Sequence, residues 1–367
     1  MMQLIMFSAS AVLLFAGHVL VWNIISGWLK IENYLLSPFL FIFLFLFLSI
    51  IISSYLIHKK DNLFTRTYYL ISAVWTGFLV NFLLVFLGVF VISLFVPNFF
   101  VNQFSLPLVV VIITVILSIY GVFKAFSSRV KNYEVKIKDL PEYWHGKEIV
   151  QISDIHLGPI YRKKFFYKTI DRINKLKPEL VCVTGDLFDG MESDFTWLNH
   201  PFSRLETRHG VYYSFGNHDL YLGFSRVKKL LENSPVIILD NKMKIVEGLQ
   251  IIGINYSFNK DFDLYQAILN QVGYSQEMPS LLLYHEPKNI NLAVKAGIDL
   301  QLSGHTHKGQ MFPFNLIAKL AYKGYDAGLF NIGEFSLIIN NGLGTWGPPM
   351  RTVGRGEISK IKLLPLN

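Results

Sequence analysis

Four long apolar stretches within the first 123 residues constrain this chain more than any other feature of its sequence. They run from Leu4 to Ile25, Leu35 to Ile57, Tyr68 to Val96 and Leu106 to Phe123. At a rise of about 1.5 Å per residue, helices of this length match a hydrocarbon core about 30 Å thick. Soluble cores rarely need four such stretches in succession, and no basic segment marks the first as a signal peptide. The sequence therefore predicts four membrane-spanning helices.

The distribution of charge divides the chain into unlike parts. Residues 1–123 carry six charged side chains, whereas the rest approaches the frequency of soluble domains, about 25%. We predict a transmembrane region over residues 1–123, a linker over 124–146 and a folded domain over 147–367. The single cysteine, Cys182, excludes an intramolecular disulfide and a cysteine-based metal site, and we expect it to be a small core residue.

Basic residues in the connections predict the orientation of the spans. Lys59, Lys60 and Arg66 lie between the second and third stretches, whereas the first and third connections contain only Lys30 between them. More basic residues follow the fourth stretch, namely Lys124, Arg129, Lys131, Lys136 and Lys138. With four spans the two basic segments lie on one side, which the positive-inside rule makes cytoplasmic. We therefore predict a multi-pass protein of the cell membrane with both termini and the folded domain in the cytoplasm.

Short apolar runs alternate with helical patterns from Glu148 onward, which is typical of a layered α/β domain. Several of these runs end directly in polar residues. The polar clusters are Asp154-Ile155-His156, Gly185-Asp186, Gly216-Asn217-His218-Asp219, His285 and Gly304-His305-Thr306-His307. Because ligands of α/β sheets bind beyond the carboxyl ends of the strands, we expect these clusters to lie together.

The clusters as a set predict a metal centre, although any one of them could simply cap a turn. The candidate ligands are Asp154, His156, Asp186, Asn217, His285, His305 and His307. Mn, Fe and Zn prefer such mixed oxygen and imidazole ligands. Two ions need about seven or eight protein ligands, since each takes about four. We therefore predict a centre for two divalent metal ions, Mn, Fe or Zn.

The order of these motifs resembles that of the calcineurin-like metallophosphoesterases. The resemblance covers roughly residues 147–365, with the five blocks in order. Three further segments resemble a bacterial membrane-associated branch of that family with N-terminal transmembrane helices: 156–159 (HLGP), 304–310 (GHTHKGQ) and 344–351 (GTWGPPMR). Lys308 and Glu286 depart from the pattern of the branch without removing a ligand. The resemblance implies a four-layer sandwich of two packed β-sheets flanked by helices.

The resemblance also implies roles for individual residues. One metal would be held by Asp154, His156, Asp186 and His307, and the other by Asp186, Asn217, His285 and His305. Metal-activated hydroxide would then attack phosphorus in a phosphodiester or pyrophosphate. His218 would donate a proton to the leaving oxygen or stabilise the transition-state charge, and Asp219 would fix the tautomer of His218 and raise its pKa. The alternative for Asp219 is a cap on the helix that follows.

Other residues have two interpretations each. Arg162 and Arg351 are candidates for substrate binding, although Arg162 could equally be a solvated helix start. Asp189 could support a metal ligand or form a loop turn. Residues 311–330, rich in Phe, Leu and Tyr, could form a lip resting on lipid or a helix packed on the domain's core.

By this resemblance we expect a membrane-anchored phosphoesterase, and the apolar stretches favour a lipid-linked substrate. The alternatives are a cyclic-nucleotide or nucleotide phosphodiesterase, and a non-catalytic membrane receptor that binds phosphate groups. The expected partners are the phosphoester and the lipid bilayer. We expect no nucleic acid, because Lys and Arg are dispersed rather than gathered along an aromatic groove, and the sequence indicates no protein partner.

Overall fold

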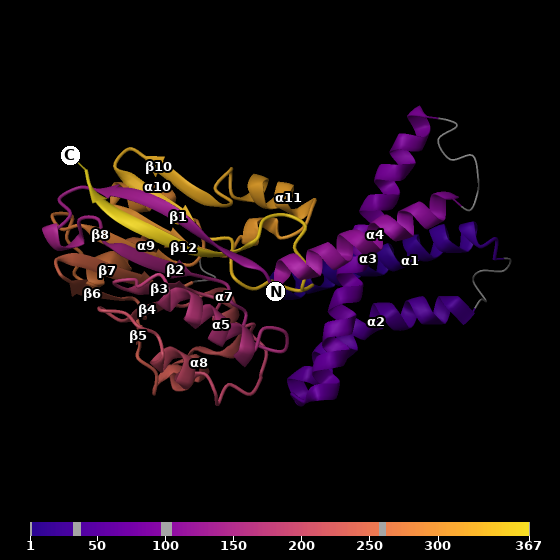
Figure 1. Cartoon of the computed structure of the whole chain (residues 1–367), viewed down its shortest axis with the longest axis horizontal. Helices are drawn as coiled ribbons and strands as arrows, with labels where there is room; N and C mark the ends of the chain where they lie inside the picture. Colours follow the sequence, from indigo (N-terminus) through magenta and orange to yellow (C-terminus); the bar gives the residue numbers. More distant parts are fainter. Residues whose placement is uncertain (1, 32–37, 97–104, 257–261, 367) are drawn as a thin grey trace. The chain divides into compact units, whose positions relative to one another are not determined.

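A computed structural model describes residues 2–31, 38–96, 105–256 and 262–366 (Figure 1). The chain divides into two compact units. The helical unit comprises Met1–Phe123 with Gly347–Met350, and the sheet unit comprises Lys124–Trp346 with Arg351–Asn367.

The helical unit contains helices α1 (Met2–Trp28), α2 (Pro38–Lys59), α3 (Leu63–Phe95) and α4 (Ser105–Ala125). Among the described residues, these four helices are long and apolar enough to cross a membrane, as predicted. Residues 35–37, the expected start of the second span, lie outside the described residues. Helix α3 starts earlier than Tyr68, because the Asn62 side chain caps it by accepting a hydrogen bond from the backbone N–H of Thr65 at 3.0 Å.

Buried polar side chains of the helical unit find partners on neighbouring helices. Trp75 Nε1 donates to His18 Nε2 at 2.9 Å, and Asn81 Nδ2 donates to Ser118 Oγ at 3.0 Å. Such bonds fasten helices to one another where no water can replace them. They give His18 and Asn81 a role in helix packing.

In the described part of the sheet unit, the strands form two six-stranded sheets (Figure 1). The first has the order β1 (Ser128–Ile137), β12 (Gly356–Pro365), β2 (Glu148–Ile152), β3 (Val181–Thr184), β4 (Val211–Ser214), β5 (Val236–Ile238). The second has the order β10 (Gly328–Ile332), β11 (Phe335–Ile339), β9 (Leu300–Ser303), β8 (Ser280–Tyr284), β7 (Leu249–Ile254), β6 (Lys242–Val246). Strands β2 to β5 are parallel, and so are β7, β8, β9 and β11.

Successive side chains of the strands point to opposite faces of each sheet, so that each sheet packs on the other sheet with one face and on helices with the other. In β3, Cys182 packs between the two sheets with Leu281 and Leu283 of β8. Its neighbours Val181 and Val183 face the other way, into a core shared with the helices over the first sheet. Those helices are α5 (Lys163–Asn174), α6 (Asn199–Ser203) and α8 (Phe224–Leu231). Helices α9 (Phe262–Gln271) and α10 (Ile290–Lys295) cover the second sheet, which confirms the predicted four-layer sandwich.

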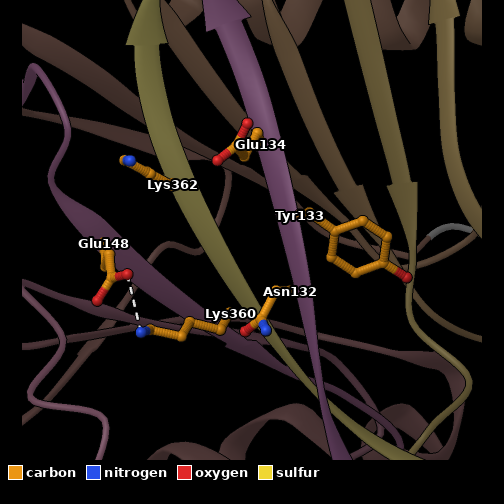
Figure 2. A pocket seen from close by; sticks show the side chains of 6 residues that line it. All are labelled: Asn132, Tyr133, Glu134, Glu148, Lys360 and Lys362. Carbon is orange, nitrogen blue, oxygen red and sulfur yellow. Dashed lines mark ion pairs between the residues drawn. The ribbon is translucent and has the colours of Figure 1, made fainter.

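The segment 124–146, predicted as a linker, is part of the first sheet instead. Strand β1 pairs with β12 in parallel over its whole length. Tyr133, Val135 and Ile137 point into the core between the sheets, so the polar residues between them face outward. Figure 2 shows this outward face, where a pocket of about 260 Å³ is lined by charged side chains and Lys360 Nζ lies 2.8 Å from Glu148 Oε1. The charges that suggested a linker belong to the solvated face of an edge strand.

Candidate metal centre

The predicted ligands follow the carboxyl ends of strands in both sheets. In the first sheet, β2 leads to Asp154 and His156, β3 to Asp186, and β4 to Asn217 at the start of α7 (Asn217–Leu222). In the second sheet, β8 leads to His285, and β9 to the pair His305 and His307, with His307 beginning the short 3₁₀ helix η3 (His307–Gly309). Two packed sheets thus contribute side chains to one place.

Potential ligand atoms form three groups among the described residues, namely two of predicted metal ligands and a third of His156, Asp189 and His218. In the first, Asp154, His156 and His307 place their ligand atoms within 4.8 Å of one another. His307 Nε2 lies 3.3 Å from Asp154 Oδ1 and 3.0 Å from His156 Nε2. This cluster matches the ligands proposed for one metal, apart from Asp186.

The second cluster consists of Asp186, His285 and His305, again within 4.8 Å of one another. His285 Nε2 lies 3.1 Å from Asp186 Oδ2 and 3.1 Å from His305 Nδ1. Asp186 Oδ2 is also 4.0 Å from His156 Nε2 of the first cluster. Asp186 therefore lies between the clusters, where a bridging carboxylate would have to be.

The loops that carry these side chains have an unusual backbone. Five candidate ligands have left-handed φ values: Asp154 (49°), His156 (52°), Asp186 (49°), His305 (70°) and His307 (48°). For residues with a Cβ this conformation costs roughly 1–2 kcal/mol each, and it clusters at functional sites. The sheet unit thus retains strained backbone where its ligand side chains converge.

Close approach of the loops demands glycine at two positions. A Cβ at Gly304 would overlap Ser153 Oγ and Asp154 Oδ2. Gly185 has a φ of +79°, and its Cβ would lie 2.6 Å from His285 Nδ1. The two glycines allow strand-end loops of both sheets to meet.

Burial and mutual charge determine protonation in the clusters. Burial opposes charge on Asp154 and Asp186, but neighbouring imidazoles, including His285, hold the pKa of both carboxyls below their usual range. Burial also disfavours charge on His285, yet the two carboxylates raise its pKa to about 10. Burial lowers the pKa of His305 and of His307 to about 4. His305 and His307 are therefore neutral at pH 7, the form in which imidazole binds metal.

His218 lies beside the two clusters of predicted ligands and contacts Asp186 and Asp189. Its N–H donates to Asp186 Oδ1 at 2.8 Å, and its Nδ1 lies 2.9 Å from the carbonyl oxygen of Asp189. The half-buried ring stands 4.7 Å from the ring of His156. With Nδ1–H donating to Asp189, the Nε2 lone pair faces away from that bond and is available for proton exchange.

Asp219 does not orient His218, contrary to the first expectation for it. Its carboxylate accepts backbone N–H groups of Gly216 and Asp186 at 2.8 Å, and of Phe188 at 3.1 Å. Burial and the charge of Asp186 raise the pKa of Asp219 to about 7, against the effect of these N–H groups. Asp219 is the cap of α7 that the alternative predicted, and it ties the Asp186 loop to that helix.

The two arginines predicted to bind substrate differ in their placement. Arg351 is fully buried, and its guanidinium donates to the carbonyl oxygens of His307 (3.2 Å), Asn341 (2.8 Å) and Gly344 (2.6 Å). Arg351 therefore holds the His307 loop and does not present a charge to a substrate. Arg162 is the residue before α5, and its contact with substrate stays a prediction.

Further side chains lie around the clusters. Asp189 Oδ1 lies 3.2 Å from His156 Nδ1, and Glu286 Oε1 lies 3.6 Å from His305 Nε2. Support of a metal ligand is one of the two interpretations that the sequence gives for Asp189, whereas nothing in the sequence predicts a role for Glu286. Four aromatic rings also flank the histidines, those of Tyr221, Tyr256, Tyr322 and Trp346. Of these, Trp346 lies within a motif of the sequence, and Tyr322 lies within the segment 311–330, which is rich in Phe, Leu and Tyr.

The arrangement of the nitrogen and oxygen atoms in the two clusters is suited to binding cations. Nitrogen atoms of paired imidazoles face each other at 3.0 Å and 3.1 Å, next to carboxylate oxygens. Asn217 is buried, and its Oδ1 accepts no hydrogen bond from any described residue. A buried acceptor of this kind is costly unless another partner satisfies it, and a cation would do so.

Comparison with known proteins agrees with the site. Residues 147–309 match the calcineurin-like phosphoesterase family. An uncharacterized metallophosphoesterase of Campylobacter jejuni is 32% identical over 255 residues, covering 68% of each chain. A transmembrane protein with metallophosphoesterase domain of Danio rerio is 30% identical over 285 residues, covering 71% of this chain but 63% of the relative. The solved structure of TT1561 from Thermus thermophilus is similar with a TM-score of 0.38 and 11% identity, covering 53% of this chain and 89% of that one.

Proposed function

The chain belongs to the calcineurin-like metallophosphoesterases, and from that premise we propose that it hydrolyses a phosphodiester or pyrophosphate bond of a lipid-linked substrate on the cytoplasmic side of the membrane. The observation that carries the proposal is the convergence of both clusters on Asp186, which lies 3.1 Å from His285 and 4.0 Å from His156. The four apolar helices support a substrate that resides in the bilayer.

The proposed ligands divide between two divalent cations. Asp154, His156 and His307 would hold one, and Asn217, His285 and His305 the other, with Asp186 shared. Bound cations would supply positive charge for the phosphoryl oxygens and would lower the pKa of water. The donor set contributes two carboxylate charges, so two divalent cations leave the centre positive. A positive centre attracts the anionic phosphoester.

The chain's own residues then orient the substrate's leaving group. His218 lies at the margin of the clusters, with its Nδ1–H directed to the Asp189 carbonyl oxygen at 2.9 Å. The Nε2 atom, once it has taken up a proton through its lone pair, is placed to pass that proton to the leaving oxygen, a contribution of about 10²–10⁴-fold in rate. Two further residues do not contact the substrate but hold the loops that carry metal ligands. Asp219 holds the Asp186 loop, and Arg351 holds the His307 loop.

The aromatic rings favour a nucleotide phosphodiesterase as the second candidate. The Tyr256 ring lies 6.0 Å from that of His305, and the exposed Trp346 ring lies 6.5 Å from that of His218. Such rings can stack on a nucleobase, with about 1–3 kcal/mol per base. Separate incubation with lipid extract and with nucleotides, followed by mass spectrometry, distinguishes the two substrate classes. Loss of a phosphoester from the nucleotide pool alone would replace the lipid-linked proposal.

The enzyme proposal is tested with a chromogenic phosphodiester and added Mn²⁺, using full-length protein in nanodiscs. We expect turnover by the parent and its loss in Asp186→Asn, because that change removes the shared carboxylate. The matched control is Asp171→Asn, since Asp171 forms an exposed ion pair with Arg204. Equal rates for parent, Asp186→Asn and control would favour a non-catalytic phosphate-binding receptor.

A further inference from the structure

Helix α11 (Phe314–Ala321) presents its large apolar side chains away from its own domain. On its half-buried side lie Asn315, Ala318 and the following Tyr322, spaced by three and four residues. On its outer side the exposed fractions are 44% for Phe314, 50% for Leu316, 58% for Ile317 and 79% for Leu320. Surface helices of globular domains normally have the opposite arrangement.

The exposed apolar face is continuous with the turn that precedes the helix, where Phe312 is 48% exposed. Isolated exposed apolar residues need no explanation, but a contiguous group on one helix face marks a surface that another phase or molecule covers. The sequence left open whether residues 311–330 pack on the domain's core. Tyr325 and Phe330 do so, and residues 328–330 belong to β10, whereas α11 has no buried residue and turns its large apolar side chains outward.

Charge and tethering identify the bilayer as the covering phase. Lys319 and Lys323 are exposed beside the apolar face, and the segment 311–325 contains no acidic residue. An amphipathic helix with this composition binds at the interface of anionic membranes. The same chain carries four helices able to cross a membrane, which keep the domain tethered to a bilayer. We propose that α11 lies in the bilayer interface, with its apolar face at the boundary of the acyl chains.

The segment that contains α11 begins and ends at the candidate metal centre. It follows His307 directly along the chain and returns to the cluster at Tyr322. The Tyr322 hydroxyl donates to Glu286 Oε1 at 3.3 Å, and its ring lies 6.1 Å from the ring of His305. A bilayer contact of α11 therefore holds the metal centre at headgroup depth. Resting on the proposed function, this narrows the substrate to an amphiphile whose phosphoester lies in the headgroup region.

The contact is tested by fluorescence in nanodiscs, independently of catalysis. Leu320→Cys is labelled with an environment-sensitive fluorophore, which spares the fully buried Cys182. Doxyl-labelled lipids then serve as quenchers. The control is Ile245→Cys, a half-exposed apolar position on β6. We expect quenching at position 320 and none at 245. A label at 320 that is not quenched overturns the proposal, and a blue-shifted but unquenched label identifies a second copy or another protein as the occupant.

A second experiment asks whether the contact serves the substrate. The double variant Leu316→Asn/Leu320→Asn is compared with Ile245→Asn on two phosphodiesters, one anchored in the vesicle by acyl chains and one water-soluble. We expect a drop of about tenfold on the anchored substrate and less than about twofold on the soluble one, because only the former needs the interface. Equal effects on both substrates contradict the proposal. Absence of turnover by the parent on either substrate contradicts the proposed function, while the quenching result still decides the contact.

Discussion

At the scale of single residues, Gly304 sets how closely the loops of the two sheets approach. The space that a methyl group would need is filled by Ser153 Oγ and Asp154 Oδ2. We predict that Gly304→Ala displaces Asp154, lowers the free energy of unfolding by about 1–3 kcal/mol and reduces metal affinity. Thermal unfolding with and without metal measures both effects. The control is Gly333→Ala, where a Cβ meets nothing within 4 Å, so that its cost comes only from a positive φ (+62°) that Gly304 lacks. Equal effects of the two changes would contradict the role of close approach.

His218 gives the sharpest catalytic prediction among the individual residues. We expect His218→Asn to reduce kcat about 100-fold or more and to leave the metal content unchanged, because the role that we propose for His218 is proton donation and not metal binding. Metal analysis and turnover of a chromogenic phosphodiester measure the two quantities on one sample. His200→Asn is the control, since His200 pairs with Tyr167 at the surface. Loss of metal in His218→Asn would make His218 a ligand instead.

The side chains of Asp219 and Arg351 show what the sequence alone cannot predict for single residues. The residue types and their positions after strands predict metal binding. They do not predict the hydrogen-bond partners of Asp219, because three backbone N–H groups reach its carboxylate only after the loops have folded. Arg351 is a similar case, since its carbonyl partners include His307, 44 residues away. The sequence indicates which groups are present, but tertiary contacts decide which way they point.

At the scale of secondary structure, strand β1 explains why residues 124–146 are not a linker. Its pattern alternates, but its outward residues carry charges that are also typical of a linker. Its partner β12 lies at the other end of the domain in the sequence. The hydroxyl of Tyr133 in β1 donates to Glu357 Oε1 in β12 at 2.8 Å, although the two residues are 224 positions apart. Local patterning predicted the five strands that lead to the metal centre. It could not predict an edge strand whose pairing is this distant.

An ion pair between the connection from β1 to β2 and the segment before β3 has a predictable pH dependence. Glu179 accepts a hydrogen bond from Tyr143 OH at 2.8 Å and lies 3.1 Å from Lys147 Nζ. Burial opposes its charge, but these partners lower the pKa of Glu179 below its usual value. Because the folded-state pKa is the lower one, the stabilisation is complete above the unfolded-state pKa, about 4.3. It is lost as the pH falls through the folded-state pKa.

We therefore predict that Glu179→Gln lowers the free energy of unfolding by about 1 kcal/mol at pH 7 and by less at about pH 3. Denaturant unfolding of metal-free protein at both pH values measures the difference. Glu192→Gln is the control, because Glu192 forms an exposed pair with Arg226. A difference between parent and Glu179→Gln that is equal at both pH values would contradict the assignment.

At the scale of the whole molecule, the basic connections predict on which side of the membrane the sheet unit lies. We predict that an impermeant thiol reagent labels Lys30→Cys on intact cells, because the proposed orientation places Lys30 in an outer connection. Lys59→Cys and Lys175→Cys should react only after permeabilisation. The buried Cys182 gives no background signal in such an experiment. Labelling of Lys175→Cys from outside would reverse the orientation and place the catalytic domain outside the cell.

The central claim is that loops from two packed sheets bring seven side chains to a pair of divalent cations. Elemental analysis of the full-length protein in nanodiscs, reconstituted in turn with Mn²⁺, Fe²⁺ and Zn²⁺, tests it most directly. We expect two ions per chain with at least one of these metals, and one or none in Asp186→Asn, with Asp171→Asn equal to the parent. Fewer than one ion per chain with every metal, or two ions retained in Asp186→Asn, would contradict it.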